Sequence, residues 1–338
     1  MGERASLIEG KYELVARVGE GSQTLVSRGV MHGAAGFTRP VALKTPREEL
    51  RLDRGYLAGF VAAARVASQL RQPNLVEVLD LARDEAGLYH LVMEWVEGMT
   101  LPAFVRSFSR QGADTPWPLV AAAGVGALRG LAAAHERVDA SGVAAPTLHR
   151  ALAPHQILLS VTGTAKLADL GLAALRPSRG RLAYAAPELA SDGTVNVRAE
   201  IYAMGAILWE ALAGVALEPG ESDLEGLDVP EGELRALEAH RSDLPPRLCA
   251  VVTRAMAREP RARFASASAM ANELSQVLGE VPWTRGPQQD LGAAVQGARI
   301  ALHRALITAG ELELTQSGIE FVPEGAEENP ILLTPQKR

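Results

Sequence analysis

The spacing of apolar residues along this chain changes near Gly98. Before Gly98, residues 11–45 and 74–96 alternate apolar with polar side chains, which is typical of half-buried β-strands. Between them, residues 56–70 place apolar side chains at helical spacing. After Gly98, long patterns of helical period dominate. Strands around one helix, followed mostly by helices, predict an α+β protein with a small sheet-containing part and a larger helical part.

Composition narrows the class of partner. The 338 residues carry a net charge of −6, which argues against nucleic acid or an anionic membrane as a partner. A single cysteine, Cys249, excludes an internal disulfide and fits a reducing, cytoplasmic compartment. The longest apolar run, 201–217, is broken by Glu210 and is short for a bilayer. We therefore expect a buried core helix there and no membrane span.

Two short motifs in the strand region bear on phosphate binding. Gly19 and Gly21 in GEGSQTLV could let a backbone turn approach phosphates, although Thr24 stands where a third glycine would be expected. A plain hairpin is an equally good interpretation of these glycines. Lys44 ends the strand pattern VALK, and by itself it would be interpreted as a solvated charge at a sheet edge.

The order of the remaining motifs changes both interpretations. They are LVMEWVEG (91–98), LHRALAPHQILL (148–159), AKLADLG (165–171), YAAPE (184–188), EIYAMGAILWE (200–210) and REPRARF (258–264). Together with GEGSQTLV and VALK, this series resembles the eukaryotic-like serine/threonine protein kinase family, in particular its bacterial members. The resemblance covers about residues 11–280 and is specific because the motifs occur jointly and in order.

The resemblance implies a bilobal, protein-kinase-like fold. It places a small antiparallel-sheet N-lobe with one main helix over 11–96, and a larger, mainly helical C-lobe over 97–280. Residues 1–10 are then an N-terminal lead, and residues 281–308 predict an extra helix packed behind the helical lobe. The last stretch, 309–338, holds six acidic and two basic residues without sustained periodicity, so we expect an acidic, flexible tail.

The resemblance also implies a nucleotide site that could still bind ATP. Lys44 matches the lysine that holds the phosphates, Met93 the side chain at the back of the adenine pocket, and Asp169 the metal-binding aspartate. The full set of implied nucleotide-binding residues is Gly19, Gly21, Val26, Ala42, Lys44, Met93, Glu94, Val96, Leu158 and Asp169.

Four further matches are structural. His149 and Arg150 match the frame of the family's catalytic loop. Glu188 and Arg263 match a buried ion pair of the helical lobe, whose retention implies that the fold is maintained.

Two alanines stand where the family carries carboxylates. Ala63 occupies the position of the acidic partner of Lys44, and no Asp or Glu occurs over 54–76, so we expect Lys44 to be less firmly positioned. Ala151 replaces the aspartate that takes or orients the proton of the attacking hydroxyl, a loss of about 10²–10⁴ in rate. No acidic residue occurs between Asp139 and Asp169.

Gln156 is the third departure, at the position of the family's metal-binding asparagine. Its extra methylene displaces the amide oxygen, and Mg²⁺ tolerates displaced ligands poorly. Metal binding at Asp169 is therefore expected to be weak or absent. His155 is the one nearby titratable group that could replace the lost acid, and an exposed loop histidine is the simpler interpretation.

These departures favour a pseudokinase, a kinase fold that acts by protein binding or allostery, with an active kinase or another signalling protein as its partner. The alternative is a weakly active or unconventional ATP-dependent serine/threonine kinase, which the retention of Lys44 and Asp169 favours. A nucleotide sensor that binds ATP, with or without metal, overlaps with the first hypothesis.

Overall fold

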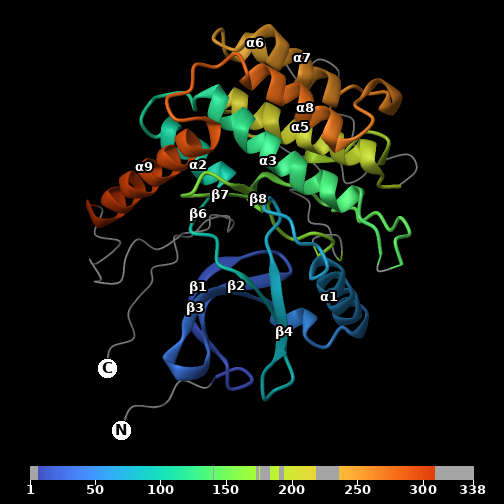
Figure 1. Ribbon diagram of the computed structural model, residues 1–338, viewed down its shortest axis with the longest axis vertical. Coiled ribbons are helices and arrows are strands. Elements are labelled where there is room, and N and C mark those ends of the chain that lie inside the picture. Colours follow the sequence, from blue (N-terminus) through green and yellow to red (C-terminus); the bar gives the residue numbers. More distant parts are fainter. Residues whose placement is uncertain are drawn as a thin grey trace.

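The computed structural model describes residues 7–139, 141–172, 175, 183–189, 194–217 and 236–308, and the predicted acidic tail lies outside them. Two lobes are stacked along the long axis of the molecule, with the sheet-containing lobe below and the helical lobe above in Figure 1. The predicted α+β bilobal architecture is confirmed.

The N-lobe is built on a five-stranded antiparallel sheet. Its spatial order is β1 (Tyr12–Glu20), β2 (Thr24–His32), β3 (Thr38–Pro46), β5 (Tyr89–Glu94) and β4 (Val78–Arg83). The central strand β3 is buried on both faces: Val41 and Leu43 join one apolar cluster, and Ala42 joins the other. This placement positions Lys44, the next residue on the Ala42 face, toward the C-lobe.

One long helix, α1 (Arg54–Ala67), packs on this sheet. It begins two residues before the expected segment because Asp53 caps it, accepting a hydrogen bond from Tyr56 N at 2.9 Å. Tyr56, Phe60 and Ala64 recur every four residues and form the buried face of the helix.

Two mostly buried helices form the centre of the C-lobe. They are α3 (Trp117–His135) and α5 (Val197–Ala213), and α5 contains most of the apolar run predicted to be a core helix. Around them lie α2 (Leu101–Ser109), α6 (Leu237–His240), α7 (Pro246–Ala255) and α8 (Ala267–Leu278). By length and composition α3 could cross a membrane, but 67% of its most apolar stretch is buried within the lobe.

A second, three-stranded sheet forms the floor of the cleft between the lobes. It consists of β6 (Gly98–Thr100), β7 (Ile157–Ser160) and β8 (Ala165–Leu167). The 3₁₀ turn η3 (Pro154–Gln156) leads directly into β7. Gly98 is required where β6 meets β7, because a Cβ there would lie 1.9 Å from the Leu159 carbonyl oxygen. The sheet thus pairs the chain that follows the hinge, the segment 95–97 between β5 and β6, with the chain that follows the catalytic-loop motif.

A last helix, α9 (Pro287–Thr308), follows the segment that matches the kinase pattern. It packs against α2, α3 and the floor sheet (Figure 1). Leu291, Val295 and Ala298 are its buried apolar residues, and they belong to the same core as α3. The extra helix expected within 281–308 is therefore an integral part of the C-lobe surface.

Candidate functional site

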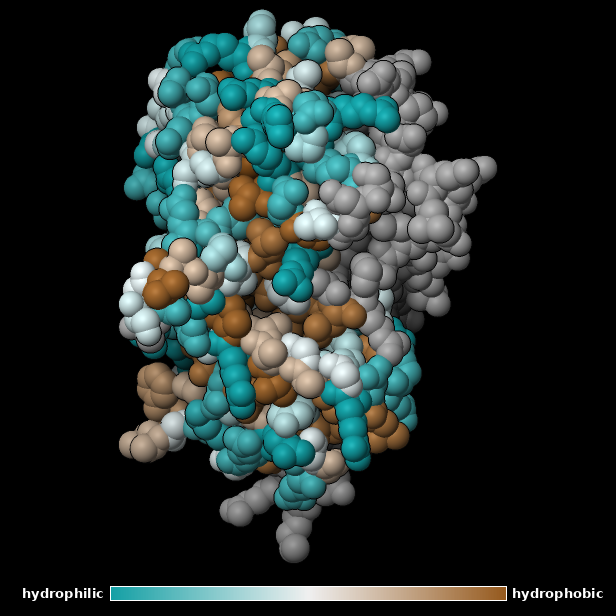
Figure 2. All heavy atoms as spheres, turned by 90° about the vertical axis from the view of Figure 1, so that its right-hand side faces the viewer, coloured by the Kyte–Doolittle hydropathy of each residue, from teal (hydrophilic) through white to brown (hydrophobic). Residues whose placement is uncertain are grey.

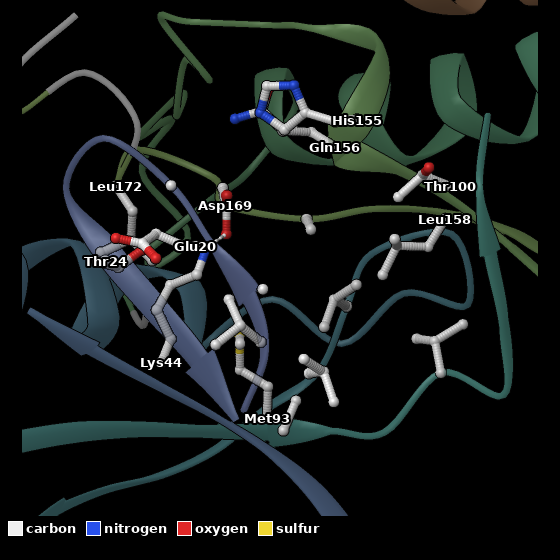
Figure 3. Close-up of a pocket in the computed structure, with 18 of the residues that line it drawn as sticks. Glu20, Thr24, Lys44, Met93, Thr100, His155, Gln156, Leu158, Asp169 and Leu172 are labelled. Carbon is white, nitrogen blue, oxygen red and sulfur yellow. Dashed lines mark hydrogen bonds and ion pairs between the residues drawn. The ribbon is translucent and has the colours of Figure 1, made fainter. Parts of the chain in front are cut away.

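A cavity of about 280 Å³ lies between the lobes. The β1–β2 hairpin, β3 and the end of β5 line its N-lobe side, and η3, β7 and Asp169 line its C-lobe side, which is uppermost in Figure 3. The structure brings all ten predicted nucleotide-binding residues to its surface: Gly19, Gly21, Val26, Ala42, Lys44, Met93, Glu94, Val96, Leu158 and Asp169.

One part of the cavity is an apolar slot. Val26 and Ala42 of the N-lobe and Leu158 of the floor sheet line it, with Met93 at the end of β5. The hinge backbone after Met93 borders the slot and is free of sheet pairing beyond Glu94. An apolar slot edged by backbone donors and acceptors suits a planar heteroaromatic ring.

The charged part of the cavity is organised around Lys44 and Asp169. The Lys44 ammonium donates to the Asp169 carboxylate, and the two side chains are only 9% and 13% exposed (Figure 3). Asp169 has a left-handed backbone, with φ of +65°, which directs this part of the chain into the cleft. Ala63 provides no acid for Lys44, and the acidic partner of Lys44 in the structure is Asp169.

Apolar packing occurs where the family's lysine–acid pair would join α1 to the cleft. Leu172, just after Asp169, is buried against Tyr56 and Phe60, and Ala63 packs at the edge of the same cluster. Leu175 reaches the same helix at Gly59. Helix α1 is thus attached to the segment after Asp169 by hydrophobic contacts.

The catalytic-loop motif keeps its structural frame. His149 is fully buried, and its Nε2 donates to the Ala168 carbonyl at 2.8 Å. Arg150 is left-handed, with φ of +70°, and its backbone N–H donates to the buried carboxylate of Glu200. Glu200 also contacts His135 Nε2 at 2.6 Å. The loop is therefore fixed to α3 and α5 without any contribution from residue 151.

The three departures lie in different environments. Ala63 is on α1, and Ala151 is buried within the catalytic-loop motif. Neither residue lines the cavity. Gln156 does line it, although the residue is only 1% exposed. Its Oε1 accepts a hydrogen bond from Ala153 N at 2.8 Å within the η3 turn. Because a backbone N–H can face only an acceptor, this contact fixes which end of the amide is oxygen.

Each carboxylate of the cavity contacts a cationic side chain. Three carboxylates line it: Glu20 pairs with Arg47 at 2.6 Å, Glu94 with Lys166 at 2.7 Å, and Asp169 with Lys44. No group of three or more His, Cys, Asp or Glu side chains suited to a metal occurs within the residues that the structure describes. A magnesium ion in this cavity would therefore depend on Asp169 together with oxygens of a bound phosphate.

Glu188 and Arg263 form the predicted buried pair away from the cavity. Both guanidinium Nη atoms contact the carboxylate at 2.7 Å, and the Arg263 side chain is fully buried. Arg263 also donates to the carbonyls of Ala257, Arg258 and Arg198, so the guanidinium ties together the ends of α7 and α5.

Several cavity residues were missed from the sequence. Tyr56, Thr100 and Leu172 line the cavity because the packing of α1, β6 and the segment after Asp169 brings them there, and no local pattern marks them. His155 is exposed, in agreement with its interpretation as a loop histidine, but it also borders the cavity beside Gln156 (Figure 3).

Helix α9 reaches the hinge through a chain of side chains. The Arg299 guanidinium, 5% exposed, donates to the Glu97 carboxylate. Glu97 also accepts from Trp95 Nε1 at 3.0 Å, and Trp95 in turn lies 5.4 Å from the Arg28 guanidinium on β2. The C-terminal helix is thereby connected to the mouth of the cavity.

The two-lobed fold, the interlobe cavity and the paired Lys44 and Asp169 together define a protein kinase fold. The family model for protein tyrosine and serine/threonine kinases matches residues 12–274, and the chain belongs to this family. Among curated relatives, the tyrosine-protein kinase MasK of Myxococcus xanthus is 33% identical over 80% of this chain, and the serine/threonine-protein kinase PknL of Mycobacterium tuberculosis is 32% identical over 88%.

Solved structures agree with this membership. The crystal structure of the PknI kinase domain of Mycobacterium tuberculosis is 28% identical, covers 82% of this chain and 99% of that domain, and superposes with a TM-score of 0.60. The chain spans 43% of the length of MasK and 74% of that of PknL.

Proposed function

We propose that this chain is a pseudokinase: a signalling module that binds ATP in the interlobe cavity and acts by protein binding or allostery, with little or no phosphotransfer. The observation that carries the proposal is the combination of Ala63 and Ala151 with a cavity whose carboxylates are all paired. Phosphoryl transfer depends on positioning and charge stabilisation, so the loss of both acids removes what the reaction needs.

Ion pairs that maintain the kinase fold support this function. Glu188 pairs with Arg263, as the resemblance implies, and Glu200 pairs with His135; both pairs lie largely within the C-lobe and hold its fold. A cytoplasmic protein partner, such as an active kinase or another signalling protein, suits a chain of net charge −6 that keeps a complete kinase scaffold.

A weakly active, ATP-dependent serine/threonine kinase is the second candidate. Lys44 and Asp169 favour it, because they are retained and lie together in the cavity. In that case Asp169 would hold the metal ion that accompanies ATP, and Lys44 would contact the phosphates.

Two measurements on the purified chain separate these candidates. Thermal shift with ATP and with ADP measures binding, and transfer of labelled phosphate to a generic protein substrate measures activity. We expect a raised melting temperature without transfer above that of the Lys44→Met and Asp169→Ala variants. Transfer that survives purification and disappears in both variants would establish the weakly active kinase instead.

A further inference from the structure

The position of Gln156 in the cavity points to how its ligand is held. Building on the proposed function, we infer that this cavity binds adenine nucleotides without a divalent metal, and that the Gln156 amide, as a donor, and the Lys44 ammonium contact the phosphates directly. This reverses the role that the position of Gln156 has in the kinase pattern, where an amide oxygen coordinates the metal.

The hydrogen bond from Ala153 N fixes the orientation of the Gln156 amide. Its Oε1 faces Ala153 N at 2.8 Å, so its NH₂ group points the other way. This Nε2 is buried and has no hydrogen-bond partner among the described residues, and Gln156 is the one residue lining the cavity with such an atom. A buried donor without an acceptor is costly, and a ligand oxygen would satisfy it.

The Gln156 NH₂ group favours a ligand of negative charge. An amide NH₂ carries partial positive charge, so it repels a cation and attracts a phosphate oxygen. Coordination through Oε1 would require the amide to turn toward the cavity, which would leave the Ala153 N–H without its acceptor inside the η3 turn. The local structure therefore favours an anion at the position where a metal would be expected.

The charge of the cavity's carboxylates is already partly neutralised. Glu20 pairs with Arg47, Glu94 with Lys166 and Asp169 with Lys44, which reduces their attraction for a metal ion. Lys44 has three N–H donors, so it can keep Asp169 while it donates to a phosphate oxygen. Gln156 and Asp169 both line the C-lobe side of the cavity, so one phosphate chain could contact Gln156 and Lys44 together.

The test is calorimetric titration of the purified full chain with ATP, ADP and adenosine, each in excess Mg²⁺ and in EDTA. We expect ATP to bind with the same affinity, within about twofold, in both buffers. Gln156→Glu keeps an oxygen for the Ala153 N–H and replaces the NH₂ donor with a negatively charged oxygen. In EDTA it should weaken ATP binding on the order of tenfold or more, and leave adenosine binding unchanged. Gln296→Glu, the same charge change on an exposed position of α9, is the matched control and should bind ATP as the parent does.

The outcomes distinguish this inference from the proposed function. ATP that binds only with Mg²⁺, or an affinity for ATP in EDTA that Gln156→Glu does not change, would overturn the metal-free site while leaving nucleotide binding intact. Absence of binding by ATP and adenosine in both buffers would overturn nucleotide binding itself. If Gln156→Glu melts far below the parent, the comparison of Mg²⁺ with EDTA on the parent chain decides the question.

Discussion

Lys44 and Asp169 form an ion pair across the cleft although 125 residues separate them in sequence. Lys44 is on β3 of the N-lobe, and Asp169 follows β8 of the C-lobe floor. The pair therefore joins the two lobes at the position where the family's lysine would otherwise pair with an acid on α1. Ala63 cannot provide that acid, and Asp169 holds Lys44 in the cleft instead. We therefore expect this ion pair to contribute to the stability of the fold.

Removal of one partner from this pair should destabilise the fold. Lys44→Met would leave the Asp169 charge nearly buried without its cation, and we expect the free energy of unfolding to fall by about 3 kcal/mol. A double-mutant cycle with Asp169→Asn, measured by urea denaturation, should show that the double variant loses less than the two single variants combined. Additive losses would mean that the two charges do not stabilise each other.

Restoring the catalytic aspartate alone should not restore phosphotransfer. Ala151→Asp supplies the missing carboxylate, but Ala63 still lacks an acid and the Gln156 carbonyl still faces Ala153. We expect transfer of labelled phosphate to a generic substrate to stay at the level of the Lys44→Met variant. A rise of more than about tenfold in Ala151→Asp would show that this one residue limits the chemistry.

Loss of Arg299 should loosen helix α9 from the hinge. Arg299→Ala removes the contact with Glu97, whose side chain is about half exposed, so we expect a loss of about 1 kcal/mol. Amide hydrogen exchange over residues 287–304 should therefore be about fivefold faster. Gln296→Ala, an exposed substitution on the same helix, should leave the exchange unchanged. Equal exchange in both variants would mean that Leu291, Val295 and Ala298 hold the helix without the ion pair.

The carboxyl of Glu210 should make stability depend on pH. Burial raises its pKa above the ordinary 4.5, and hydrogen bonds from Leu217 N–H and Tyr184 O–H only partly offset this. Since the folded pKa exceeds the unfolded one, the contribution of Glu210 to stability is complete below pH 4.5 and is lost as the pH rises through the folded pKa.

Glu210→Gln isolates this effect because the amide oxygen can still accept from both partners and cannot ionise. Relative to the parent chain, the variant should gain in free energy of unfolding between pH 4 and pH 8, as measured by urea denaturation at each pH. A difference that is constant across this range would show that Glu210 does not titrate differently in the folded and unfolded states.

Arg263 should be among the most costly residues to replace in the C-lobe. Arg263→Leu leaves Glu188 without its cation and removes donors from three carbonyls, so we expect a loss of about 3–5 kcal/mol. Arg263→Lys should recover only part of this, because an ammonium cannot span both carboxylate oxygens. The exposed neighbour variant Arg261→Ala should change stability little. Full recovery by lysine would mean that charge alone, without the planar fork, is sufficient.

The two lobes that the sequence predicts are seen in Figure 1. On the face shown in Figure 2, apolar residues gather around the middle, with more polar regions above and below. This is the level at which sequence periodicity predicts well, because strand and helix patterns depend on which side chains face the core.

The cavity residues were also predictable, because each belongs to a motif with a fixed place in the kinase pattern. All ten reach the cavity, and the absence of acids at Ala63 and Ala151 can be read directly from the chain. Tyr56 and Leu172 could not be predicted in the same way, since they line the cavity only through the packing of α1 against the segment after Asp169.

Local periodicity and motif order were sufficient to predict the two lobes, the order of their elements and ten of the residues that line the cavity. They could not predict which groups contact one another. The Lys44–Asp169 and Arg299–Glu97 pairs join residues 125 and 202 positions apart, so they depend on how distant elements pack together. The direction of the Gln156 amide is set by the Ala153 N–H three residues earlier, and it follows from the backbone conformation of the η3 turn rather than from a residue pattern.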